Sequence, residues 1–452
     1  MKPFSWNTIV SFCGLKLHRY YAVASVSVLF SFGLQAEPYS LEDAVRKAQS
    51  QDIWLEGSRS REESLNAMSV QSGTLPDPKV SLSAANWPTD SFDFSQEPMT
   101  QVKVSVSQMF PRGATRQLQK ERWEQLALVQ PYARASRSAE VALSVSEAWL
   151  EAYRSQRTID IIQKKQDLFD HLVGVAESGY ASALSNARQQ DVIRAQLERT
   201  RLEDRLTRLL QQYEVQKAQL GEWLFDADIS IALETPDLRK AGLSEADLIE
   251  ALSLHPKIKV IEQKVRTHVT SIKLAEQQYK PQWGVNASYG YRDDDLQGRD
   301  RADFLSLGIS FDVPLFTNNR QDKQVQAAKA TADAVKTEKS LLLRQLKAGY
   351  EGANAKYRRL LERKNLFDAR LLREMDEQAE ASLNAYTNDN GDFSEVVRAR
   401  IAELNARIEA LNINVDIQKS ISKINYFLAG SLGGNKSSVA ANSTGIQGQL
   451  DE

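Results

Sequence analysis

Cysteine and histidine are scarce in this chain of 452 residues, and their scarcity excludes several kinds of site. The single cysteine, Cys13, lies in an N-terminal leader, so a processed chain has no thiol for a disulfide, a zinc site or a nucleophile. Four histidines are scattered without the spacing of metal ligands, and no nucleophile motif or phosphate-binding loop occurs. We therefore expect neither an enzyme nor a cofactor or metal site. The histidines are His18, His171, His255 and His268.

Glycine, proline and net charge are also low. The chain has 21 Gly and 12 Pro, below the average shares of about 7% and 5%, which favours long uninterrupted helices. Lys and Arg (57) nearly balance Asp and Glu (59), so the net charge of −2 provides no field that would attract nucleic acid. The mean hydropathy is −0.44 and there is no series of apolar runs of about 20 residues, which excludes a polytopic helical membrane protein.

Residues 1–36 have the layout of a secretory signal peptide. Three basic residues and no acidic residue precede the apolar run Tyr20–Leu34, and we expect cleavage after Ala36. A retained single-pass anchor is the alternative, but the run is short and no stop-transfer charges follow it.

The sequence repeats itself once, at an offset of 203 residues. Pro78 and Pro281 are separated by this offset, and so are Pro111 and Pro314. Between these prolines apolar and polar residues alternate, which is typical of strands with one apolar and one polar face. The pattern predicts two β-hairpins, over residues 79–108 and 283–313. The polar faces include Lys79, Ser81, Ser83, Lys103, Ser105, Asn286, Ser306 and Ser310.

The remainder of each copy has apolar residues at the 3.5-residue spacing of coiled coils. The pattern predicts a helical first repeat over residues 37–224, a linker at 225–243, a second repeat over 244–430 and a disordered tail at 431–452. In each repeat, one long helix has the length of two short helices stacked end to end. The expected helices cover residues 41–72, 114–176, 185–222, 244–280, 320–386 and 393–428.

Four strands cannot close a barrel, and open sheet edges are not tolerated in lipid because unpaired backbone groups cost several kcal/mol each. Short strands with alternating faces are the signature of outer-membrane barrels. The sequence therefore predicts a mainly α protein with a small β part, which trimerises to close a twelve-stranded β-barrel. The loops at 86–100 and 292–303 would face outward. Asp293, Asp294 and Asp295 in the second loop are either a solvated loop segment, which we favour, or a calcium site.

Several motifs, in their order, resemble the TolC-like outer-membrane efflux protein family. Pro-Asp-Pro at Pro76–Pro78 precedes the first strand, Gln108–Pro111 closes the second, and Val313–Phe316 follows the fourth. Gln190–Gln196 and the segment from Tyr386 to Val397 are similar to the family's helix-turn signatures. The resemblance implies a homotrimeric tunnel in the outer membrane, continued across the periplasm by an α-helical barrel. Its partners would be outer-membrane lipid, a periplasmic adaptor protein and an inner-membrane pump.

The resemblance also implies a constriction near the periplasmic tips, in turns at 177–184 and 387–391. Glu395 matches the first position of an acidic ring, whereas Arg398 stands where the family has a second acid and Asp392 is an alternative source of acidity. Residues expected to contact an adaptor at the tips are Gly179, Tyr180, Asp389 and Gly391. Aromatic residues expected at the membrane interfaces are Trp87, Phe110, Trp283, Tyr289, Tyr291 and Phe316.

Several classes of exported cargo are compatible with the sequence. Small toxic solutes such as drugs or heavy-metal cations are expected, with a weak preference for metals from the strand flanks, and an exit duct for type I protein secretion is an alternative. A secreted coiled-coil stalk or adhesin would explain the heptads, but it leaves the paired hairpins without a role.

Overall fold

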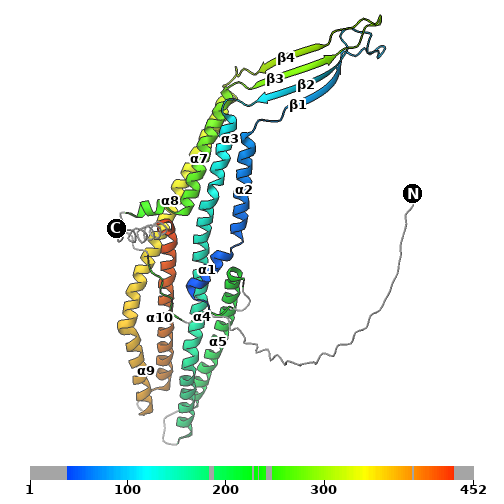
Figure 1. Ribbon diagram of the computed structural model, residues 1–452. Helices are drawn as coiled ribbons and strands as arrows, with labels where there is room; N and C mark the ends of the chain where they lie inside the picture. Colours follow the sequence, from blue (N-terminus) through cyan, green and yellow to red (C-terminus); the bar gives the residue numbers. More distant parts are fainter. Residues whose placement is uncertain are drawn as a thin grey trace, which may run out of the picture. The chain divides into compact units, whose positions relative to one another are not determined.

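The computed structural model describes residues 38–182, 188–225, 229–232, 234–240, 247–388 and 391–431, all within the unit Pro38–Glu452. The predicted signal peptide lies outside these residues, as does the predicted tail from residue 432 onward. Helices dominate the described part, and one small sheet joins them (Figure 1). No described helix is long and apolar enough to cross a membrane.

The sheet confirms both predicted hairpins. β1 (Lys79–Ala85) pairs with β2 (Gln101–Phe110), and β3 (Trp283–Tyr291) pairs with β4 (Phe304–Phe311). The two hairpins, one from each repeat, join through β2 and β3 into one antiparallel sheet of order β1-β2-β3-β4. Residues far apart in sequence therefore share one surface, and β1 and β4 form its two edges.

In the first repeat, the helix expected over 41–72 is two helices, so the prediction of a single helix was wrong there. α1 (Leu41–Gln51) ends at Asp52, whose backbone is extended, and α2 (Trp54–Gly73) follows. Asp52 holds this break because its carboxylate accepts a hydrogen bond from the Trp54 backbone N–H and pairs with Arg137 at 2.7 Å.

The long helix of the first repeat consists of α3 (Thr115–Ala127) and α4 (Val129–Ala181). The helix expected over 114–176 is interrupted at Leu128. Pro131 falls in the first turn of α4, where its missing N–H costs no intrahelical hydrogen bond. α5 (Gln189–Leu224) completes the repeat.

The second repeat contains α6 (Leu248–Ser253), α7 (Pro256–Glu276), the 3₁₀ turn η2 (Gln277–Tyr279), and the long helix that follows β4. His255 interrupts the helix expected over 244–280, because Pro256 takes the first position of α7 and the His255 ring accepts a hydrogen bond from the Lys257 N–H. The long helix runs through α8 (Gln321–Leu366), a π-helical turn η3 (Phe367–Leu371) and α9 (Leu372–Thr387), and α10 (Phe393–Phe427) closes the fold.

The long helices pack beside the short ones as the helix lengths suggested. α3 and α4 lie against α2 and α5 on one side and against α7 and α10 on the other (Figure 1). α7 also packs on α8, and α10 packs on both α8 and α9. The apolar residues that follow the coiled-coil spacing along α4 are buried, except for the half-buried Ala148, which confirms the coiled-coil interpretation. They include Val141, Val145, Ala152, Ile159, Ile162, Phe169, Val173 and Ala176.

Candidate functional site

The sheet has one apolar face, and that face is exposed. The register places Leu82, Val104, Tyr289 and Leu305 in one row across all four strands. A second row contains Val80, Val106, Ala287 and Leu307. Leu82 is 73% exposed, Leu305 73% and Leu307 77%, values that are unusual for aliphatic side chains in regular structure. A contiguous surface of this kind marks contact with lipid or with another protein.

The opposite face is polar and more crowded. Ser81, Ser105, Ser288 and Ser306 form a row with one serine from each strand, and the Ser81 and Ser105 hydroxyls are 2.7 Å apart. Ser288 is buried within the single protomer. A Cβ at Gly308 would lie 2.5 Å from Asn286 Oδ1, so neighbouring side chains lean over the glycine positions of this face. This crowding fits a sheet that curves toward its polar side.

The proposed interface aromatics divide between the two ends of the strands. Phe110 and Trp283 are register partners near the helices. The ring of Trp283 lies 4.9 Å from that of Phe311, an aromatic residue that the sequence analysis did not assign to the interface. Phe316, beyond β4, is 89% exposed. Tyr289 and Tyr291 lie on the apolar face toward the loops. Trp87 lies within the first loop, where its indole N–H donates to the Phe92 carbonyl and its ring contacts Phe94.

The loops at 86–100 and 292–303 hold each other in place. Ser95 donates a hydrogen bond to Asp293, and Arg301 donates to the Ser95 and Glu97 carbonyls. Asp295 accepts from the backbone N–H groups of Gln297 and Arg299. The Asp run thus serves loop structure in two of its three members, and no group that could hold a metal is found among the described residues.

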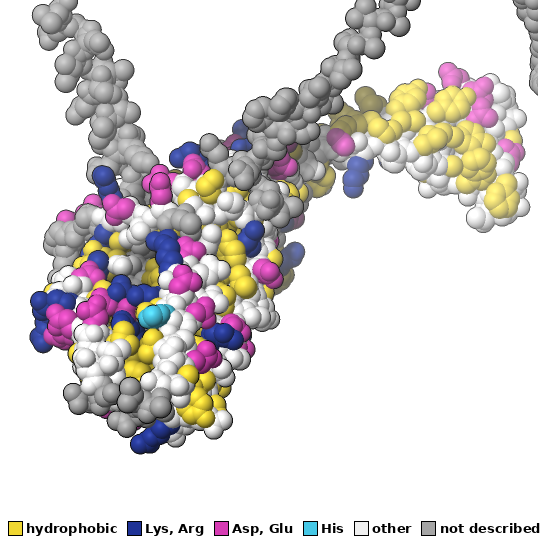
Figure 2. All heavy atoms as spheres, turned by 90° about the horizontal axis from the view of Figure 1, so that it is seen from below, with side chains coloured by type: hydrophobic (Ala, Val, Ile, Leu, Met, Phe, Trp, Pro, Cys, Tyr) yellow, Lys and Arg dark blue, Asp and Glu magenta, His cyan; other side chains and the backbone are white. Residues whose placement is uncertain are grey.

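At the other end of the protomer, the three proposed gate residues lie on one side of α10. Asp392, Glu395 and Arg398 follow at intervals of three residues, and all three are exposed. The opposite side of the same turns is buried against α4, α5 and α9 through Phe393, Val396 and Val397. The view from below shows Lys and Arg mixed with Asp and Glu over this end (Figure 2). The structure therefore keeps the three charges together and accessible.

Asp392 begins α10 as its N-cap. Its carboxylate accepts a hydrogen bond from the Ser394 N–H at 2.9 Å, which satisfies one of the free donors of the first turn. The hydrogen bonds from Ser394 lower the pKa of Asp392, and the nearby positive charges of Arg194 and Arg188 lower it further. Asp392 is therefore a charged cap flanked by arginines, which makes Glu395 the freer of the two carboxylates for an acidic ring.

The structure describes three of the four proposed tip residues. Asp389 lies outside the described residues. Tyr180, at the end of α4, is 55% exposed, and Gly179 is half-buried beside it. Gly391 has a structural reason to be glycine, because a Cβ there would lie 2.8 Å from the Tyr386 backbone nitrogen and 3.0 Å from the Ala385 carbonyl carbon. The backbone at this turn approaches too closely for any side chain.

Above the tip, a buried charge cluster joins α4, α9 and α10, and sequence reasoning missed it. Glu403 is 3% exposed and is surrounded by Lys165 at 2.7 Å, Arg400 at 2.8 Å and Arg407 at 3.2 Å. Arg407 also forms two hydrogen bonds with Asp376 on α9. Burial alone would raise the pKa of Glu403, but the hydrogen bonds and charges of Lys165 and Arg400 outweigh it and lower the pKa to about 2.

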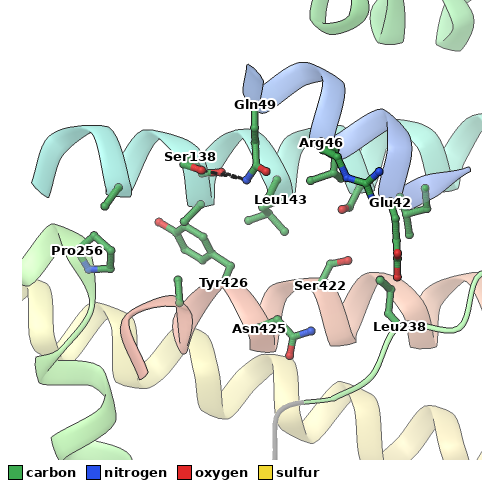
Figure 3. Close-up of a pocket in the computed structure, with 17 residues that line it drawn as sticks. Glu42, Arg46, Gln49, Ser138, Leu143, Leu238, Pro256, Ser422, Asn425 and Tyr426 are labelled. Atoms are coloured by element: carbon green, nitrogen blue, oxygen red, sulfur yellow. Dashed lines mark hydrogen bonds between the residues drawn. The ribbon is translucent and has the colours of Figure 1, made fainter. Parts of the chain in front are cut away.

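A groove of about 700 Å³ lies where the upper parts of α1, α4 and α10 meet (Figure 3). Gln49 of α1 donates hydrogen bonds to Ser138 of α4 on one wall, and Ser422 and Tyr426 of α10 form the other wall. The groove is lined mainly by carbon atoms and by uncharged polar groups, with Glu42 and Arg46 among its charged residues. It lacks the convergent acids, bases or nucleophiles of a catalytic centre.

No family model and no curated relative matches the chain. Solved structures do match it. CusC superposes with a TM-score of 0.73 at 13% identity, over 86% of this chain and 91% of that one. The outer membrane protein VceC of Vibrio cholerae has a TM-score of 0.69 at 15% identity, over 86% of this chain and 96% of its own. The MtrE outer membrane channel of Neisseria gonorrhoeae has a TM-score of 0.69 at 14% identity, over 87% and 89%.

At these identities the similarity establishes the fold. In these three structures it extends over 86–87% of the chain. The resemblance inferred from the sequence motifs is confirmed at this level: the chain has the fold of the TolC-like outer-membrane efflux channels.

Proposed function

We propose that this protein is the outer-membrane exit duct of a tripartite efflux system. Three copies close a twelve-stranded barrel in the outer membrane of a Gram-negative bacterium, and their helices continue it as a tunnel through the periplasm. A periplasmic adaptor and an inner-membrane pump deliver small toxic solutes to the tip, and the solutes leave through the barrel. No bond is made or broken, so the work of the protein is to select and to conduct.

The exposed apolar face of the sheet is the observation that carries this proposal. It lies on strands of seven to ten residues, and transmembrane strands have about 9–11 residues. In the described part of the chain, nothing pairs with the outer edge of β1 or of β4. Lipid accounts for the exposed face, and the β4 edge of a neighbouring copy accounts for the open β1 edge.

The helices support the same arrangement. One side of the protomer ends in α2 and α5, where Val70 is 68% exposed, Ile193 57% and Leu197 47%. The other side ends in α8 and α9, where Leu341 is 51% exposed and Leu366 50%. Apolar side chains at both ends of a row of helices suit a ring in which each copy packs its α8 side against the next copy's α5 side.

The width of the barrel bears on the cargo. A lumen bounded by twelve strands is wide enough for water and small solutes. Export of drug-like solutes or metal cations suits this width, and type I secretion of an unfolded protein is the second candidate. A water-soluble stalk is disfavoured by the exposed apolar rows centred on Leu82 and Leu305.

Disulfide cross-linking between sheet edges tests the closure. Because Cys13 lies in the predicted leader, cysteines introduced in the mature chain would be its only thiols. Variants would pair Ser81→Cys or Ser83→Cys on β1 with Ser306→Cys or Ser310→Cys on β4, in membranes under mild oxidation. We expect covalent dimers and trimers on denaturing gels for at least one pair.

The matched control is Ser105→Cys with Ser288→Cys, which are register partners within one protomer. This pair should cross-link without any change in mass. If every edge pair stays monomeric while the internal pair cross-links, the barrel closed by neighbouring copies is contradicted.

A further inference from the structure

The polar face of the sheet carries positive charge only. The four strands contain no Asp or Glu, whereas Lys79 and Lys103 both lie on the polar face. Lys79 is exposed and Lys103 half-buried, and within the described residues neither forms an ion pair or a hydrogen bond. The other side chains of this face are small or uncharged, among them the serine row. The two lysines therefore set the sign of the field at this surface.

The two lysines lie at different heights. Lys79 stands opposite Ser107, whereas Lys103 stands opposite Ser83, four residues further along β1. At about 3.3 Å per residue the two levels are about 13 Å apart, with the serine row between them. This separation is close to the Debye length of about 10 Å at 0.1 M salt, so the fields of the two levels overlap along the strands.

Asp303 and Asp312, next to the ends of β4, do not cancel this charge, whereas Asp77 is exposed two residues before Lys79 and offsets part of it at that end of β1. Asp303 lies on the apolar side, where the Tyr289 hydroxyl donates to it. Asp312, after β4, is paired with Arg112. The guanidinium of Arg292 lies 4.0 Å from the centre of the Phe304 ring, which belongs to the polar face, and adds a third positive group at the loop end.

We infer that the barrel lumen favours small anions, such as organic solutes that carry carboxylate or phosphate groups, over cations. The inference rests on the proposed function, because closure into a barrel turns the polar face inward and repeats each lysine three times. Six ammonium groups then line a water-filled passage whose strands contain no acid. Low-dielectric walls focus such a field and raise the local concentration of counter-ions. This charge does not suit the metal cations that the strand flanks suggested.

Ion selectivity of the full-length trimer in planar bilayers tests this inference. The reversal potential in a KCl gradient centred near about 0.1 M gives the ratio of chloride to potassium permeability. Compared with the unmodified protein, Lys79→Gln with Lys103→Gln should lower this ratio about twofold or more, because all six charges disappear. Lys79→Gln with Lys103→Glu should lower it further, because the strands then carry net negative charge, and the charge-preserving pair Lys79→Arg with Lys103→Arg should leave it unchanged.

All variants keep the same periplasmic tip, so the charge of the gate contributes equally to each. At about 1 M salt, where the Debye length is about 3 Å, the variants should converge. Channels with equal permeability ratios in the Gln, Glu and Arg variants would overturn the inference and leave the exit duct intact. Absence of any channel in the unmodified trimer would instead contradict the proposed function.

Discussion

The ammonium group of Lys165 on α4 lies 2.7 Å from a carboxylate oxygen of Glu403 on α10, although 238 positions separate the two residues. Glu403 is buried, and its remaining bonds go to Arg400 and Arg407 of its own helix. Arg407 in turn binds Asp376 of α9. Three helices thus meet at one buried carboxylate above the proposed gate.

Replacing Glu403 by Gln should destabilise this part of the molecule strongly. Removing one partner of a buried ion pair leaves the other charges uncompensated and typically costs about 3–5 kcal/mol. We expect a clear loss of thermal stability of the helical circular dichroism signal of the detergent-solubilised trimer. Glu374→Gln, which removes an exposed partner of Arg370, should change stability by less than about 1 kcal/mol. Equal effects of the two substitutions would contradict the role of the cluster.

Acid should weaken the same cluster. The pKa of Glu403 is about 2 in the folded protein, below its ordinary value of 4.5. The unfolded chain therefore binds the proton more readily, and the stabilisation is complete above pH 4.5 and is lost as the pH falls toward about 2. Melting curves between these pH values should show a steeper loss in the unmodified protein than in Glu403→Gln. Parallel curves would contradict the assigned pKa.

His255 should add a second pH dependence at milder acidity. Burial lowers the pKa of His255 to about 4 from 6.5, and its ring accepts a hydrogen bond from the Lys257 N–H. Protons bind the unfolded chain preferentially between these values, so stability should fall as the pH drops from 6.5 toward 4. His255→Asn retains a helix-capping side chain but does not titrate.

We expect the His255→Asn variant to melt at a lower temperature than the unmodified protein and with a smaller slope against pH in this range. The exposed His171, replaced by Asn, is the control and should leave the slope as it is. An unchanged slope in His255→Asn would show that other groups cause the pH dependence.

Removing the negative charge of Glu395 and removing the positive charge of Arg398 should have opposite effects on channel block by cations. Three copies of Glu395 near one axis would attract multivalent cations, whereas Arg398, one turn further along α10, would repel them. Single-channel recordings with a trivalent cation on the periplasmic side should show weaker block in Glu395→Ala and stronger block in Arg398→Ala. Unchanged block in both variants would remove these residues from the constriction.

The sequence predicted the fold well where a periodic pattern spans a whole element. Alternation at period two identified all four strands, and the offset between Pro78 and Pro281 showed that the hairpins belong to a repeat. The coiled-coil spacing correctly identified the buried seam of α4. These patterns are local, and each is repeated often enough to outweigh single exceptions.

The position of a helix break and the burial of an ion-pair cluster were harder to predict. Asp52 ends α1 because Arg137, 85 positions away, holds its carboxylate, and no local signal reveals that partner. Glu403 lies three residues from Arg400 and four from Arg407, a spacing that is ordinary for exposed helix pairs. The ion pair with Lys165 of α4, a residue distant in the sequence, distinguishes this buried carboxylate from an exposed one.

The mass of the particle extracted from membranes tests the account most directly. Native mass spectrometry of the mature protein, released from detergent or lipid nanodiscs, should give three copies of the chain, and the particle should precipitate when detergent is withdrawn. A stable single copy that stays in aqueous buffer without detergent would contradict the account, because the exposed rows around Leu82 and Leu305 would then need neither lipid nor a neighbouring copy.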